Sequence, residues 1–143
     1  MHNLKRMVAI AAICAGGAMA STARAEVAVV VSSKSSAGSL TAAQASDIFL
    51  GKSSAFPSGG NAVPIDQSEG SAVRDEFYTK VAGKSSAQVK AYWSKIIFSG
   101  KGQPPKEVAD SAAVKKQLAE NPNAVGYIDK AAVDGSVKTL LVN

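Results

Sequence analysis

The run Val27-Ala28-Val29-Val30-Val31 constrains the fold more than any other stretch of the sequence. Its residues are all apolar and mostly β-branched, which favours a strand over a helix. A strand that is apolar at every position has no face suited to solvent. The sequence therefore predicts a strand buried on both faces, inside a protein built of layers.

Helix signals separate this run from the other strand-like segments. Thr41-x-x-Gln44 and Ser85-x-x-Gln88 are capping boxes, in which the hydroxyl accepts a bond from a free helix N–H and the glutamine reaches back. The helix after the first box should end near Gly51 and bury Ala45, Ile48 and Phe49. The helix after the second box should bury one apolar face, with Trp93 as a core anchor: Val89, Tyr92, Trp93, Ile96 and Ile97.

The remaining elements continue the alternation of strands and helices. Three further strands are expected, at 62–65, 124–128 and 137–142. Two further helices are expected, one with Val73, Phe77 and Val81 as its buried stripe and one at about 111–120 with Val114 and Leu118 inward. The segment 99–105 should be irregular because it holds two glycines and two prolines. This order predicts an α/β protein.

The first 25 residues have the features of a cleaved export signal. Lys5 and Arg6 precede an alanine-rich apolar run at 7–20, and Ala23-Arg24-Ala25 is a small-x-small cleavage pattern. We expect residues 1–25 to be a signal peptide and 26–143 to be one mature periplasmic domain. A membrane anchor needs about 20 apolar residues, and lipid attachment at Cys14 would need a small residue before it.

Cleavage would narrow the possible chemistry. The only histidine, His2, and the only cysteine, Cys14, lie in the leader, which excludes Cys/His nucleophiles and most zinc sites. The net charge falls from +5 to +2, because Lys5, Arg6 and Arg24 leave. The remaining lysines are scattered, so no nucleic-acid partner is expected. Without a paired acid and base, we expect a non-enzyme that uses no cofactor and no metal.

Residues 65–77, IDQSEGSAVRDEF, have the outline of an anion cradle, because a strand-like run ends in a Ser/Gly turn that opens a helix. The stretch also carries four carboxylates. One carboxylate at about 4 Å from a charged oxygen costs about 1–4 kcal/mol, against the roughly 0.3–2 kcal/mol that a helix terminus returns. If Asp66 and Glu69 face the cradle, doubly charged phosphate is repelled, and if they face water, the site survives but is weak. Acidic residues in a first helical turn also stabilise the helix, so the carboxylates could serve the helix alone.

Three phrases in this order resemble one protein family: Ile48-Phe49-Leu50-Gly51-Lys52, then Tyr92-Trp93 leading to Phe98-Ser99-Gly100-Lys101-Gly102, then Asn123-Ala124-Val125-Gly126-Tyr127-Ile128. Over about residues 40–130 they resemble the phosphate-binding periplasmic proteins of ABC importers (PstS-like), which have the type II solute-binding fold. The resemblance implies a small mixed sheet flanked by helices, with ligand at strand C-termini and helix N-termini. Family members close two lobes on phosphate, and this chain is long enough for about one.

The resemblance also implies site residues. In the family an arginine, an aspartate and a Ser-Gly-Thr turn contact phosphate. The turn is matched best by Ser68, Gly70 and Ser71. The arginine position falls on Ile65 or Asp66, and Arg74, inside the following helix, does not replace it by position. A serine-rich loop that contacts ligand from the first lobe could be supplied by four residues: Ser35, Ser36, Gly38 and Ser39.

Two functions remain open. The first is an exported protein that binds phosphate or a similar oxyanion for an ABC-type uptake system, with an ABC permease or another envelope protein as partner. The second is a periplasmic interaction module that kept the lobe and lost the ligand, which the missing arginine favours. Tight sites bury about 70–90% of a small ligand. A single open lobe should therefore bind weakly, or at an interface with a second chain.

Overall fold

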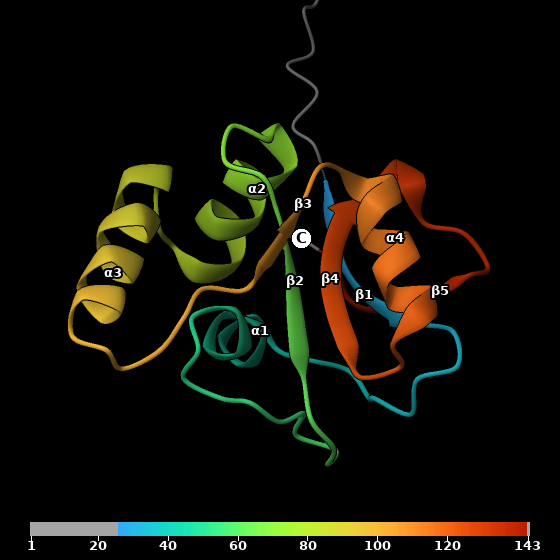
Figure 1. The fold of residues 1–143 in the computed structure, drawn as a ribbon. Coiled ribbons are helices and arrows are strands. Elements are labelled where there is room, and N and C mark those ends of the chain that lie inside the picture. The colour runs from blue at the N-terminus through green and yellow to red at the C-terminus, as the bar shows by residue number, and fades with distance from the viewer. Residues whose placement is uncertain (1–25, 143) are drawn as a thin grey trace, which may run out of the picture.

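A five-stranded mixed sheet organises residues 26–142, the part of the chain that the computed structural model describes (Figure 1). The strands are β1 (Val27–Ser32), β2 (Val63–Gln67), β3 (Lys106–Val108), β4 (Ala124–Asp129) and β5 (Val137–Val142). Their order in the sheet is β3-β2-β4-β1-β5. β2 runs parallel to β3 and β4, whereas β1 is antiparallel to β4 and β5. The expected signal peptide, residues 1–25, lies outside the described residues.

The helices are α1 (Ala42–Phe49), α2 (Ala72–Phe77), α3 (Ser86–Phe98) and α4 (Ser111–Glu120), with a π-helical turn η1 (Tyr78–Ala82) after α2 and a short 3-10 turn η2 (Lys130–Ala132). Both predicted capping boxes form. Thr41 and Gln44 exchange side-chain to backbone bonds of 3.0 and 3.1 Å at the start of α1, and Ser85 and Gln88 do the same at α3. Local hydrogen bonding thus sets where these two helices begin.

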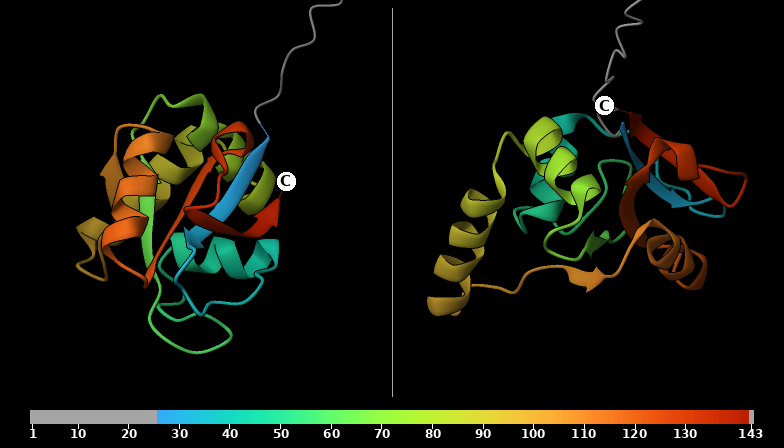
Figure 2. Two further views of the ribbon diagram at one scale, coloured as in Figure 1. Left: turned by 90° about the vertical axis from the view of Figure 1, so that its right-hand side faces the viewer. Right: turned by 90° about the horizontal axis from the view of Figure 1, so that it is seen from above.

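The two faces of the sheet carry separate cores, as the run at 27–31 predicted. Val27, Val29 and Val31 face a cluster that includes side chains of α1 and α2, while Ala28 and Val30 face a cluster with α4. Figure 2 shows α4 on one side of the sheet and α1 on the other. The predicted fold class, an α/β protein whose small mixed sheet is flanked by helices, is confirmed. No helix within residues 26–142 is long and apolar enough to cross a membrane.

The helix α3 differs from its prediction, because it stands at the edge of the molecule (Figure 1). Its buried side includes Trp93, whose ring lies so close to Gly51 that a Cβ at that glycine would be only 3.1 Å from it. Tyr92 donates its hydroxyl proton to the Leu50 carbonyl at 2.6 Å. Ile97, expected in the core, is 53% exposed, and Phe98 is 94% exposed. The body of the protein therefore covers only the first part of the apolar face of α3.

Candidate functional site

The Ser68–Ser71 turn forms as predicted, between the C-terminal end of β2 and the start of α2. Ser71 caps α2: its Oγ accepts from the N–H of Arg74 at 3.3 Å and donates to Gln67 Oε1 at 2.9 Å. Gly70 has φ +94°, in the region that side chains rarely adopt. Ser68 donates to the Val108 carbonyl through both its N–H, at 2.9 Å, and its Oγ, at 3.2 Å. The turn is thus tied to β3 and to its own helix.

These bonds leave the turn a limited set of donors for a ligand. The hydroxyls of Ser68 and Ser71 are engaged within the protein. The N–H groups of Ala72 and Val73, in the first turn of α2, have no acceptor inside the helix. Backbone groups are therefore the donors that the turn itself can offer, and a charged partner has to come from elsewhere.

Arg74 brings a cation to the end of β2, beside the Ser68–Ser71 turn. This corrects the expectation that no arginine serves the turn. Its Nη1 donates to the Gln67 carbonyl at 2.8 Å and to Glu107 Oε1 at 2.7 Å. The same nitrogen lies 3.8 Å from Asp66 Oδ2. Arg74 is only 8% exposed. Although the residue belongs to α2, its guanidinium reaches back to the end of β2.

Asp66 does not face water, which is one of the two orientations considered from the sequence. It is 2% exposed and accepts hydrogen bonds from the hydroxyls of Tyr78, at 2.5 Å, and Tyr127. These two tyrosines come from η1 and β4. The arrangement binds the end of β2 to both neighbouring elements through one buried carboxylate.

Burial governs how this cluster ionises. Burial raises the pKa of Asp66, although the bonds from Tyr127 and Tyr78 and the charge of Arg74 act in the opposite direction. Burial and the charge of Asp66 raise the pKa of both tyrosines far above the usual range, so they remain donors. Burial acts to lower the pKa of Arg74, but Asp66 and Glu107 outweigh it and raise the pKa, so the guanidinium stays charged.

A pocket of about 180 Å³ opens beside Arg74, between the ends of β2 and β3 and the side of α3. Two cations line it, Arg74 and Lys90, together with three carboxylates, Asp66, Glu69 and Glu107. Lys90 Nζ lies 3.9 Å from Glu69 Oε1, and both groups are exposed, so this pair is weak. The volume is below the roughly 300–1,000 Å³ typical of sites for drug-sized ligands. The pocket suits a small ion with several hydrogen-bond acceptors.

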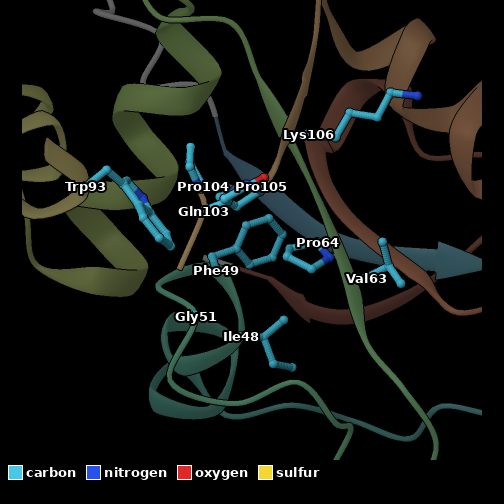
Figure 3. Close-up of a pocket in the computed structure, with 10 residues that line it drawn as sticks. All are labelled: Ile48, Phe49, Gly51, Val63, Pro64, Trp93, Gln103, Pro104, Pro105 and Lys106. Atoms are coloured by element: carbon cyan, nitrogen blue, oxygen red, sulfur yellow. The ribbon is translucent and has the colours of Figure 1, made fainter. Parts of the chain in front are cut away.

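A second pocket, of about 260 Å³, lies between α1, the start of β2 and the segment before β3 (Figure 3). Its walls are mainly apolar, and include Phe49, Pro64, Trp93 and Pro104. Lys106 is the one charged residue among those that line it. Within residues 26–142 no group of three or more histidine, cysteine, aspartate or glutamate side chains could hold a metal ion. The charged pocket beside Arg74 is therefore the candidate site.

The other predicted site residues lie at the opposite end of the sheet. Ser35, Ser36, Gly38 and Ser39 follow β1, which is antiparallel to β4, and β4 is parallel to β2. The end of β1 is consequently at the same end of the sheet as the start of β2, whereas the Ser68–Ser71 turn follows the end of β2 at the other end. Three of the four residues are exposed, and the carbonyl of Ser35 accepts from Lys138 Nζ at 2.8 Å. The structure does not bring the two turns together.

The helix face of Arg74 is the sequence signal that could have identified it. Arg74, Phe77, Tyr78 and Val81 follow the spacing i, i+3, i+4 and i+7, which puts the arginine on the buried stripe of its helix. A charged residue on such a stripe needs a buried partner. A comparison by position with the family pattern does not find Arg74, because the family arginine precedes the turn and Arg74 follows it.

Comparison with known proteins supports the fold. No family model and no curated protein matches the sequence. A protein from Clostridium perfringens, solved with bound phosphate and assigned as a phosphate ABC transporter substrate-binding protein, matches with a TM-score of 0.65 and 24% identity, over 81% of this chain and 45% of that one. An ABC-type phosphate transport receptor from Vibrio cholerae matches with a TM-score of 0.62 and 20% identity, over 81% of this chain and 46% of the receptor. A candidate phosphate-binding protein from Planctomyces limnophilus matches with a TM-score of 0.58 and 15% identity, over 82% of this chain and 42% of that protein.

These matches confirm, at the level of the fold, the resemblance that the three sequence phrases predicted. Over the matched part, the chain shares the α/β fold of solved proteins assigned as phosphate ABC transporter substrate-binding proteins. It spans less than half the length of each of these solved structures.

Proposed function

We propose that the mature chain is an exported, non-catalytic protein that binds phosphate or a similar oxyanion for an ABC-type uptake system. The observation that carries this proposal is the position of Arg74. Its charged guanidinium lines a small pocket beside the Ser68–Ser71 turn. The fold around it is shared with proteins assigned to phosphate transport, one of which was solved with phosphate.

The geometry assigns distinct roles to these groups. A planar guanidinium offers several donors in a fork that matches an oxyanion, and such charge-assisted bonds are about twice as strong as neutral ones. The free N–H groups of Ala72 and Val73 add donors at the start of α2. Asp66 also lines this pocket, but its oxygens accept the hydroxyl protons of Tyr78 and Tyr127, so two donors partly offset its negative charge.

The charge balance of the pocket predicts weak binding and a preference for ligands of low charge. Two cations face three carboxylates there, and each carboxylate at about 4 Å from an anion costs about 1 kcal/mol or more. Singly charged phosphate should therefore bind better than the doubly charged form. Affinity for phosphate should rise as the pH falls through its second ionisation.

Titration calorimetry on residues 26–143, refolded to remove carried-over ligand, tests the proposal with phosphate, sulfate and molybdate. We expect saturable one-to-one binding of phosphate, lost in Arg74→Gln and weakened in Arg74→Lys. Lys80→Gln is the matched control. Lys80 lies in η1, directly after α2, and its cation is paired with Glu76 of α2. Absence of heat at millimolar phosphate, or binding that survives Arg74→Gln, would overturn the proposal.

An interaction module is the second candidate, and the exposure of Ile97 and Phe98 on α3 favours it. An exposed pair of large apolar side chains is typical of a surface that another protein covers. The test is capture of partners from envelope extract by the mature protein and by Phe98→Ser. A stoichiometric partner lost in Phe98→Ser, together with no phosphate heat, would favour this function over oxyanion binding.

A further inference from the structure

Arg74 makes two strong contacts of different kinds, and only one of them fixes its position. The bond from Nη1 to the Gln67 carbonyl, 2.8 Å, joins the guanidinium to the buried end of β2. The bond from the same nitrogen to Glu107 Oε1, 2.7 Å, joins it to a side chain that is 47% exposed. The second contact faces the pocket that both residues line.

Glu107 is the carboxylate that can leave. It lies on β3, a strand of three residues at the edge of the sheet. Within residues 26–142, Arg74 is the only group that donates a hydrogen bond to the Glu107 side chain. Asp66 differs in both respects, because it is buried and bonded to two tyrosine hydroxyls. The carboxylate of this ion pair is half-exposed, although Arg74 is buried, so water screens the pair from the Glu107 side and a ligand with comparable contacts can displace Glu107.

We infer that Glu107 occupies the place on Arg74 that an oxyanion ligand takes, so that binding exchanges one carboxylate for one oxyanion. This inference rests on the proposed function. Glu107 thereby sets the affinity of the site and its preference among ions. With Glu107 present the pocket holds two cations and three carboxylates, and without its charge the balance is even. The repulsion is larger for a doubly charged ligand than for a singly charged one.

The test is phosphate titration of the mature protein and of Glu107→Gln, which keeps the size of the side chain and one acceptor oxygen but replaces the other oxygen by an NH2 group and removes the charge. We expect Glu107→Gln to bind phosphate at least about fivefold more tightly, the equivalent of about 1 kcal/mol. Glu120→Gln is the matched control, since Glu120 is an exposed residue at the end of α4 and does not line the pocket. The gain should vanish when Arg74→Gln is added to Glu107→Gln.

Each outcome of this titration decides between the claims. Tighter binding by Glu107→Gln than by the wild type, with no change in Glu120→Gln, supports the inference. Binding by Glu107→Gln alone overturns the proposed function and with it the inference. Wild-type binding that Glu107→Gln leaves equal or weaker overturns the inference while the proposed function stands. No binding by either protein at millimolar phosphate overturns both. Thermal melting without ligand, which should be similar for the two proteins, shows that the variant is folded.

Discussion

Two serine- and glycine-rich turns of this protein, 35–39 after β1 and 68–71 after β2, have similar composition and very different surroundings. The first is largely exposed, and its charged neighbour is Lys138, which bonds the Ser35 carbonyl. The second lies over a buried cluster of Asp66, Arg74 and two tyrosines. A turn rich in donors is common in loops. The buried charges behind the turn, rather than its composition, distinguish a candidate site.

The largest expected effect comes from removing the support of the second turn. Asp66→Ala leaves the hydroxyls of Tyr78 and Tyr127 buried without their acceptor and removes a charge partner of Arg74. We expect a loss of about 3–5 kcal/mol in the free energy of unfolding, measured by urea denaturation. Asp75→Ala, an exposed carboxylate on α2, should change it by about 0.5 kcal/mol or less. Similar losses from the two variants would remove the contrast between the turns.

The same substitution at one glycine of each turn sharpens the comparison. Gly70 has φ +94° and open space around its Cα, so Gly70→Ala carries backbone strain alone, about 1–2 kcal/mol. Gly38 has no positive φ, and a Cβ there would make an ordinary 3.8 Å contact with Ser58. Gly38→Ala should therefore leave stability nearly unchanged or raise it slightly. Equal costs for the two variants in urea denaturation would show that the turns do not differ in conformation.

A serine in each turn gives a smaller difference. Ser71→Ala removes the cap of α2 and a partner of Gln67, and should cost about 1 kcal/mol. Ser39 is exposed, so Ser39→Ala should fall within about 0.5 kcal/mol of the wild type. Thermal melting of the two variants under one condition measures the difference. A Ser39→Ala protein that melts as low as Ser71→Ala would contradict it.

The pH dependence of stability gives the most gradual effect. Burial raises the pKa of Asp66 above its ordinary value of 3.8, so the folded protein holds this proton more tightly than the unfolded chain does. The stabilisation that this raised pKa gives the folded protein is complete below the ordinary pKa. It is lost as the pH rises through the pKa that Asp66 has in the folded protein. Wild type should therefore lose stability relative to Asp66→Asn as the pH increases from the ordinary value. A constant or reversed gap between their unfolding free energies would contradict the raised pKa.

Local patterns were enough to predict most of the architecture. The apolar run of β1, the two capping boxes and the helix at 111–120 all rest on residues within a few positions of each other, and the structure confirms them. The strand β3 was not predicted, because Lys106-Glu107-Val108 has no apolar pattern and pairs only at a sheet edge. Helical periodicity placed Ile97 in the core, but it cannot show how far the body of the protein extends beneath α3.

The candidate site was less predictable because its parts meet across long sequence distances. The Ser68–Ser71 turn is local, and it forms as expected. The orientation of Asp66 depends on Tyr127, 61 positions later, and the state of Arg74 depends on Glu107, 33 positions later. The separation of the Ser35–Ser39 turn from this site follows from the antiparallel pairing of β1 with β4. None of these pairings has a signature in the sequence alone.

We propose that the turn backed by Arg74 binds an oxyanion and that the turn at 35–39 does not. Amide and arginine side-chain NMR signals of residues 26–143, followed while phosphate is added, test it most directly. We expect saturating shifts at Gly70, Ala72, Val73 and the Arg74 guanidinium, with Ser36 and Ser39 unchanged. Shifts centred on Ser36 and Ser39, or no shifts at millimolar phosphate, would contradict it.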